Sequence, residues 1–224
     1  MASAGKKALP ETIAYHIQGE IRSRIIHGHY APGRALREQE LEQEFGSSRG
    51  PIRESLRLLL QNGLVEHRPR RGFRVRDYTA ADLRHIYKLR ANLEALVIDD
   101  LEGRDLTKLT QNLTASNRRM EKHVAKNNRQ GFFEENVAYH QLLIDAAENE
   151  PLARVMTYVN EISLPVRYRL IGESMPSGRS VKYHGRLINA LKTGKIEKAQ
   201  SIIREHILEN LERAIAVFSQ EQAA

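Results

Sequence analysis

The sequence predicts a mainly α-helical protein, with an N-terminal winged helix-turn-helix followed by a C-terminal antiparallel six-helix bundle. Two observations predict this fold class. Residues 33–75 combine two short amphipathic helices, a tight turn and an arginine-rich hairpin, whereas from Tyr78 onward the pattern changes to long amphipathic helices without a recognisable strand. We therefore expect one domain in residues 1–77 and another in residues 78–224, linked at Asp77-Tyr78.

Composition narrows the protein class. The 224 residues suit two compact domains, and the absence of Cys excludes disulfides and thiolate metal sites. No apolar run approaches the roughly 20 residues needed to span a bilayer, and residues 1–12 lack the apolar core of a signal peptide, so we expect a cytoplasmic protein with no membrane partner. The net charge is +7, of which residues 1–78 contribute +5. The N-terminal domain is thus the more basic part.

Helical spacing of apolar residues predicts three helices in the N-terminal domain. The first starts at Pro10 and stops at Gly28, the second covers Glu38–Phe45 and is broken by Gly46, and the third begins after Ser48 as its N-cap and ends near Asn62-Gly63. Their core stripes are Ile13, Ile17, Ile21, Ile25 and Ile26 in the first helix, and Ile52, Leu56, Leu59 and Leu60 in the third. Two strands, Leu64–His67 and Phe73–Arg76, complete a hairpin, the wing.

This arrangement favours binding to double-stranded DNA. The third helix can lie in a major groove with Arg49 and Arg53 on one face, against guanine edges and phosphates. The hairpin would contact the flanking minor groove or backbone. Between His67 and Arg76 it carries five arginines and no acid: Arg68, Arg70, Arg71, Arg74 and Arg76. A charge run by itself is usually a solvated surface, but directly after a helix-turn-helix pattern it indicates a nucleic-acid contact.

The same segment resembles a known family. The strings Y-x-P-G-x-x-L, E-L-x-x-x-F-G-x-S-R-x-P-I-R-E-x-L, N-G-L-V and R-G-F-x-V are similar to the winged-helix domain of GntR-type bacterial transcription regulators. The resemblance implies DNA contacts from Arg49 and Arg53, assisted by Arg37, Ser48 and the wing residues Arg71 and Gly72. The chain departs from the family at Ser47, where an apolar residue is usual, and at Gly50, where Thr commonly contacts phosphate.

The C-terminal region has six expected helices with three inward histidines. The helix spans are Thr79–Leu101, Leu106–Lys126, Gln130–Glu148, Pro151–Gly172, Gly178–Thr193 and Lys195–Phe218. Each of His140, His184 and His206 shares an apolar stripe with its helix neighbours, and Asn136 precedes His140 by four residues. One inward histidine is more often a hydrogen-bonded core residue than a ligand. Three on different helices need a shared compensation, which a metal ion provides.

These helices resemble the ligand-binding FCD domain of the FadR subfamily, and their number resembles its shorter, VanR-like branch. The strings that carry the resemblance are E-N-V-A-Y-H-Q-L-L, Y-H-G-R-L-I-N-A-L-K-T-G and I-I-R-E-H-I. In that domain an Asp and three His commonly hold a divalent metal, zinc or nickel, and small carboxylates complete the coordination. The resemblance implies that His140, His184 and His206 are ligands here, whereas Asn136 stands at the acid position and removes one negative charge.

Arginines are candidates for binding an organic acid. The segment K-L-R-A-N-L-E-A-L resembles the R-x-x-L-E motif of the family, which implies that Arg90 faces the pocket and binds a carboxylate. The alternative is a surface arginine paired with Glu94 at i+4. Arg167 and Arg169 are further candidates that the sequence does not orient.

Together these features predict a homodimeric transcription regulator, a repressor of a catabolic operon, that binds an inverted-repeat operator and is controlled by a small organic acid near the metal. One alternative is a regulator for which the metal alone is the signal. Another is a three-histidine zinc enzyme. Against the enzyme, no carboxylate base is recognisable beside the ligands, and the DNA-binding module would be left unexplained.

Overall fold

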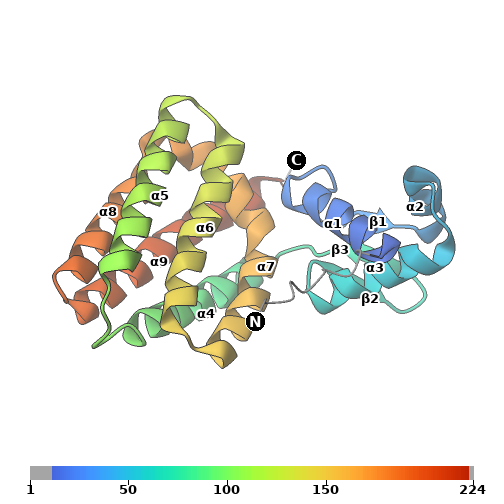
Figure 1. Ribbon diagram of the computed structural model, residues 1–224. Helices are drawn as coiled ribbons and strands as arrows, with labels where there is room; N and C mark the ends of the chain where they lie inside the picture. Colours follow the sequence, from blue (N-terminus) through green and yellow to red (C-terminus); the bar gives the residue numbers. More distant parts are fainter. Residues whose placement is uncertain (1–11, 222–224) are drawn as a thin grey trace, which may run out of the picture. The chain divides into compact units, whose positions relative to one another are not determined.

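The computed structural model describes the backbone of residues 12–221, and their side chains except those of residues 173, 174, 176 and 218–221. The chain divides after Asp77 into two compact units (Figure 1). Most of the described chain is helical, as the sequence predicts. In the part of the chain that the structure describes, no helix is both long enough and apolar enough to cross a bilayer.

The N-terminal unit is a winged helix-turn-helix. Its elements are α1 (Ile13–Ile26), β1 (Ala35–Leu36), α2 (Glu38–Phe45), α3 (Arg49–Gln61), β2 (Val65–Arg68) and β3 (Gly72–Val75). β3 pairs antiparallel with both β1 and β2 and so lies in the middle of the sheet. The fold class is confirmed, although each hairpin strand is displaced by one residue from its predicted span. β1 was missed because two residues are too short to show an alternating pattern. The predicted helix start at Pro10 lies outside the described residues.

The core of this unit is built mainly on α3. Ile52, Leu56 and Leu59 are fully buried, and α3 packs against α1. Two residues of the predicted stripes are not in the core, since Ile13 is 64% and Leu60 is 39% exposed. Leu60 follows Leu59 by about 100° around the helix and therefore leaves the buried face.

The C-terminal unit consists of helices within residues 78–221. They are α4 (Ala80–Asp99), α5 (Thr107–Ala125), α6 (Arg129–Ala147), α7 (Glu150–Ser174), α8 (Arg179–Lys192) and α9 (Ile196–Glu221), with a short 3-10 turn, η1 (Met175–Ser177), before α8. The six α-helices match the number expected, and their ends differ from the predicted ones by three residues at most. Thr79 and Asp82 form a capping box that starts α4, because each side chain binds the backbone N–H of the other residue.

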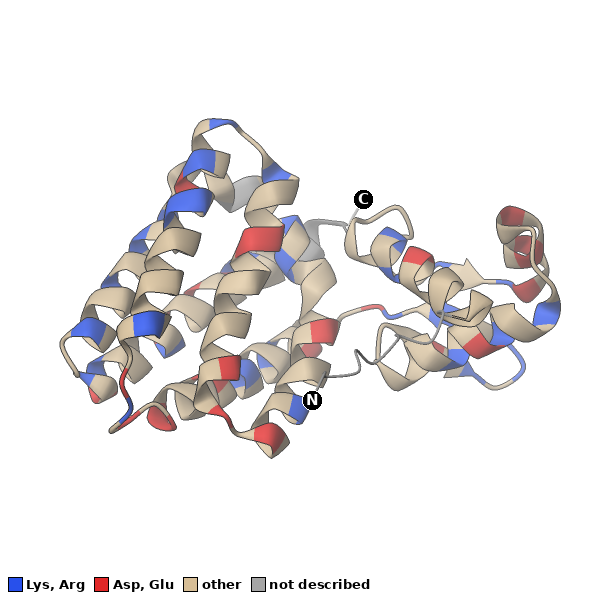
Figure 2. Cartoon of the chain, in the orientation of Figure 1, with Lys and Arg blue, Asp and Glu red and all other residues tan. Residues whose placement is uncertain are grey.

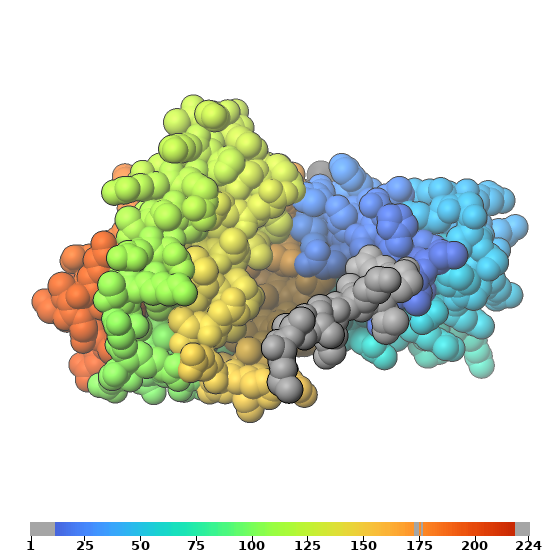
Figure 3. All heavy atoms as spheres, viewed as in Figure 1, coloured from blue at the N-terminus to red at the C-terminus, as the bar shows by residue number. Residues whose placement is uncertain are grey.

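The helices of the bundle pack in extended pairs. α4 lies along α9, and α5 runs antiparallel to α6 after the short connection at residues 126–128. In Figure 3 the atoms of α5 and α6 form one continuous surface. The interior between the helices is filled by large apolar side chains, among them Leu83, Leu113, Phe132, Met156 and Ile203. Several polar side chains are buried with them, and these form the candidate site described below.

Candidate functional site

The exposed face of α3 carries three arginines at four-residue spacing. Arg49, Arg53 and Arg57 are exposed, whereas the apolar residues of the opposite face are buried. Ser48 is the N-cap residue, as predicted, but its side chain makes no capping hydrogen bond and its position is exposed. Arg57 was missed by the sequence interpretation, although it repeats the spacing of Arg49 and Arg53.

One carboxylate joins the two predicted recognition arginines. Glu38, the first residue of α2, accepts from Arg49 Nε at 2.6 Å through Oε2 and from Arg53 Nε at 3.1 Å through Oε1. Partial burial tends to raise the pKa of Glu38, but the hydrogen bond from Arg49 and the charge of Arg53 outweigh it, so the pKa lies below its ordinary value. Arg37, the N-cap residue of α2, pairs with Glu40 at 2.6 Å and has a side chain that is 73% exposed.

The hairpin uses its arginines in two ways. Arg70 and Arg71 are exposed in the turn between β2 and β3, which is blue in Figure 2. Gly72 has φ +72°, a left-handed conformation that favours glycine. Arg74, by contrast, donates through Nε and Nη2 to the carbonyl oxygen of Gly33, at 3.2 and 2.7 Å. Not every arginine of the predicted run is therefore free for DNA, because Arg74 holds the preceding loop to the sheet.

A surface groove separates α3 from the hairpin. Its volume is about 490 Å³, and its lining includes Arg37, Arg49, Arg53, Arg71 and Gly72. These are all of the predicted DNA-contacting residues except Ser48. A groove lined by guanidinium groups suits phosphate oxygens and the acceptor atoms of guanine.

The three predicted histidines meet in the interior of the bundle. His140 of α6, His184 of α8 and His206 of α9 are buried, and one ring nitrogen of each lies within 4.8 Å of the others. Nitrogens bound to one Zn²⁺ through bonds of about 2.0–2.1 Å lie at most about 4.2 Å apart, so rings near the 4.8 Å limit would move closer together around an ion. Both ring nitrogens of His184 are buried without a hydrogen-bond partner among the described residues. Since a buried polar group needs a partner, the donor set fits a metal ion.

Neighbouring side chains fix the histidine rings. His140 Nδ1 lies 2.7 Å from Glu94 Oε2, so its Nε2 is left to face the other rings. Tyr139 stacks on His184, with 3.9 Å between the ring centroids and 10° between their planes. Glu94 is a correction to the sequence interpretation, which found no carboxylate beside the histidines. The signal was present in the R-x-x-L-E motif, but only the fold brings that glutamate to His140.

Burial keeps the three imidazoles neutral. It lowers the pKa of His184 well below the ordinary value and that of His206 to about 3. Burial also lowers the pKa of His140, although Glu94 acts in the opposite direction. Glu94 itself stays ionised because the charge of Arg90 and the hydrogen bond with His140 outweigh its burial and hold its pKa well below the ordinary value. Neutral imidazoles are the form that binds a metal.

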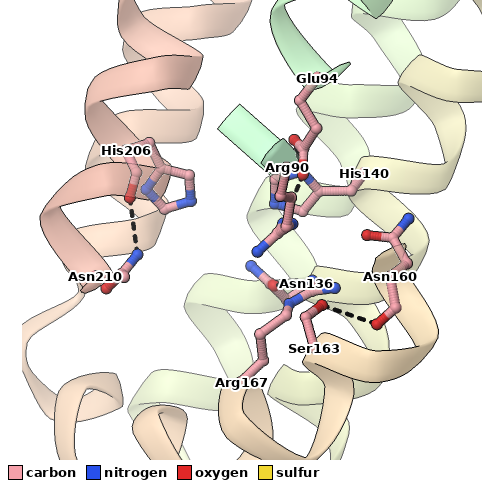
Figure 4. Close-up of polar contacts among 9 residues, drawn as sticks. All are labelled: Arg90, Glu94, Asn136, His140, Asn160, Ser163, Arg167, His206 and Asn210. Carbon is pink, nitrogen blue, oxygen red and sulfur yellow. Dashed lines mark hydrogen bonds and ion pairs between the residues drawn. The ribbon is translucent and has the colours of Figure 1, made fainter. Parts of the chain in front are cut away.

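A small cavity beside the histidines is lined by two arginines (Figure 4). Its volume is about 30 Å³, and its lining includes Arg90, Asn136, Arg167, His140 and His206. The close-up shows the side chains of Arg90, Asn136 and Arg167 converging. Arg167 Nη2 donates to Asn136 Oδ1 at 3.0 Å, so the residue at the expected acid position already binds a cation. Burial, followed by the charge of Arg90, lowers the pKa of Arg167 to about 9.

The structure combines the two alternatives for Arg90. Its side chain is 5% exposed and lines the cavity, and it also pairs with Glu94, with 2.7 Å between Nη2 and Oε1. Arg90 is therefore a cavity residue, as the family resemblance implies, and it is also the ion-pair partner of Glu94, as the alternative predicts. Arg167 lines the cavity as well, whereas Arg169 does not. The helix α7 alone could not reveal this difference, since the two residues lie about 200° apart around it.

Comparisons with known proteins agree with both units. Residues 13–75 match the family described as bacterial regulatory proteins, gntR family, and residues 85–209 match the FCD domain. The chain is 26% identical over 207 residues to the probable D-xylose utilization operon transcriptional repressor of Paenarthrobacter nicotinovorans, covering 92% of this chain and 91% of that protein. It is 26% identical over 179 residues to the gluconate operon transcriptional repressor of Bacillus subtilis, covering 78% and 73%.

The fold is also similar to a solved one. A putative GntR transcriptional regulator from Rhodococcus sp. RHA1 superimposes with a TM-score of 0.74 at 21% identity, covering 91% of this chain and 97% of that structure. The matched families are those of regulators rather than of enzymes. The N-terminal unit matches the GntR family, and the FCD match covers more than half of the chain. The chain therefore belongs to the GntR family of DNA-binding transcription regulators, and its FCD domain places it in the FadR subfamily.

Proposed function

We propose that this regulator is a homodimeric repressor of a catabolic operon, released from its operator by a small organic acid that binds beside a divalent metal. The observation that carries the proposal is the convergence of three buried histidines next to a cavity with two buried arginines. The relatives named as repressors of D-xylose and gluconate operons support the assignment to catabolism.

The proposed metal ligands are His140, His184 and His206, with the amide oxygen of Asn136 in the fourth place. Three imidazoles and one oxygen donor suit Zn²⁺, and nickel or another transition metal accepts the same donors. Glu94 holds the His140 ring from behind through Nδ1, as acidic residues commonly do for metal-binding histidines. When bound, the metal supplies open coordination positions for an acid. Because Asn136 is neutral, it neutralises less of the charge of the metal than an Asp would.

The charges of the cavity favour an anion. Arg90 is paired with Glu94, but no carboxylate of the described residues forms an ion pair with Arg167, which donates instead to the amide oxygen of Asn136. A buried charge is costly unless it is paired, so the effector carboxylate would supply the missing counter-charge. The cavity of about 30 Å³ holds about two water molecules. Binding of a larger acid therefore needs side chains to move, which is how a ligand can favour one conformation of the protein over another.

DNA binding is assigned to the groove of the N-terminal unit. In this proposal Arg49 and Arg53 contact bases and phosphates in the major groove, and Arg57 extends that row. Arg37, Ser48, Arg71 and Gly72 contact the backbone or the flanking minor groove. A dimer of such units reads an inverted repeat, because two-fold symmetry in the protein requires two-fold symmetry in the operator.

Exposed apolar side chains support dimerisation through the C-terminal unit. Leu89 and Leu96 on α4 are 48% and 45% exposed, and Val155 and Tyr158 on α7 are 48% and 44% exposed. The two helices pack against each other. Exposed apolar residues gathered on neighbouring helices are typical of a protein–protein interface.

Operator affinity tests the whole proposal. An operator is first recovered by selection from random duplexes, and its affinity is measured on metal-free protein, on Zn²⁺-loaded protein, and on loaded protein with each of a panel of carboxylates that a thermal-shift screen identifies. We expect one acid to weaken operator binding only when Zn²⁺ is present. A change caused by Zn²⁺ alone would favour a metal-responsive regulator, and no change in any condition would refute effector control.

A further inference from the structure

Glu38 occupies an unusual place for an acidic residue. It lies in the groove lined by arginines that faces DNA in our proposal, where a negative charge is repelled by phosphates. Its side chain is only 18% exposed, whereas those of Arg49 and Arg53 are 68% and 51% exposed. The carboxylate is therefore packed behind the two guanidinium groups rather than free in solvent.

The geometry shows which atoms the carboxylate uses. Each oxygen accepts from the Nε of one arginine, at 2.6 Å for Arg49 and 3.1 Å for Arg53. The terminal Nη groups of both arginines are not used by Glu38 in these hydrogen bonds. A guanidinium group held at Nε keeps its terminal N–H donors for a guanine edge or a phosphate. Glu38 thus orients the two arginines without using up their terminal donors.

The charge of Glu38 has a second consequence. Two arginines four residues apart on a helix repel each other, and a carboxylate between them offsets that repulsion. The same carboxylate removes one unit of positive charge from a surface that attracts any DNA. Non-specific binding depends almost entirely on that attraction, whereas specific binding also depends on correctly oriented donors.

We propose that Glu38 is a specificity-determining residue, which orients Arg49 and Arg53 for base recognition and weakens binding to non-operator DNA. Specificity is the difference between the affinities for operator and non-operator DNA. The negative charge of Glu38 weakens binding to every DNA sequence, but only the operator offsets this loss, because it accepts hydrogen bonds from the oriented arginines. The difference between the two affinities therefore increases. The proposal rests on the assignment of Arg49 and Arg53 to the DNA interface.

The test compares two isosteric substitutions in the full-length protein. Glu38→Gln removes the bridging charge, and Glu54→Gln is the matched control, because Glu54 is exposed on α3 itself and has no ion pair among the described residues. Fluorescence anisotropy gives the Kd for the selected operator and for a random duplex of equal length at several salt concentrations. Thermal melts verify that each variant is folded.

We expect Glu38→Gln to bind the random duplex more tightly, with a salt dependence of log K steeper by about one. Its ratio of operator to random affinity should fall at least about tenfold, whereas Glu54→Gln should keep the parent ratio within about twofold. An unchanged ratio in Glu38→Gln, or an equal fall in Glu54→Gln, would overturn the proposal. Arg49→Ala distinguishes a failure of this proposal from a failure of the assigned DNA interface. If Arg49→Ala leaves operator binding unchanged, the assigned DNA interface is wrong. If Arg49→Ala weakens operator binding while Glu38→Gln keeps the affinity ratio, only the role of Glu38 is wrong.

Discussion

Mild acid should destabilise the C-terminal unit through His206. Burial lowers the pKa of this imidazole to about 3, whereas the unfolded chain has the ordinary histidine pKa of about 6.5. Between these two values the unfolded chain binds a proton that the folded protein does not, so stability increases with pH in that window and is lost as the pH falls below about 6.5. At about 1.36 kcal/mol per pH unit, a change from pH 7.5 to pH 5.0 costs about 2 kcal/mol from His206 alone.

Differential scanning calorimetry of EDTA-treated protein can measure this loss. For a domain of this size 1 kcal/mol corresponds to about 2–4 °C, so the contribution of His206 to the fall in Tm is about 4–8 °C. His206→Gln removes the titrating group and should reduce the fall by that amount. His85→Gln, at an exposed position on α4, is the control and should behave like the parent. Equal Tm losses in the parent and in His206→Gln would refute the reasoning.

Three further outcomes follow from the sites. Arg49→Ala and Arg53→Ala should each weaken operator binding by about 1–3 kcal/mol in anisotropy titrations without lowering Tm, because both side chains are exposed; parent-like affinity in both would contradict the docking. Elemental analysis should find close to one divalent ion per chain, retained more tightly in Asn136→Asp and lost in His184→Ala; no metal in the parent and in Asn136→Asp would leave a metal-free acid site. Leu96→Glu should convert the dimer to a monomer in sedimentation, since it places a charge on the exposed apolar side of α4, and an unchanged dimer would exclude that surface.

The sequence by itself determined the local elements. The winged helix-turn-helix could be predicted because its helices, turn and hairpin are set by spacing, capping residues and glycines that lie within about 45 residues of each other. The inward faces of His140, His184 and His206 could be predicted for the same reason, since the apolar stripe of a helix identifies its buried side. Resemblance to the GntR and FCD families then supplied roles for these residues.

The tertiary structure decided which side chains meet. Glu94 and His140 are 46 residues apart, and Arg167 and Asn136 are 31 apart, so no local pattern could pair them. Helical periodicity predicts that a residue faces inward, but the neighbour it meets depends on how helices rotate and slide against one another. The ion pairs of Glu38 with Arg49 and Arg53 could not be predicted for the same reason. The sequence shows that the arginines repeat at four-residue spacing on one helix, but only the packing of the helices places the Glu38 carboxylate behind them.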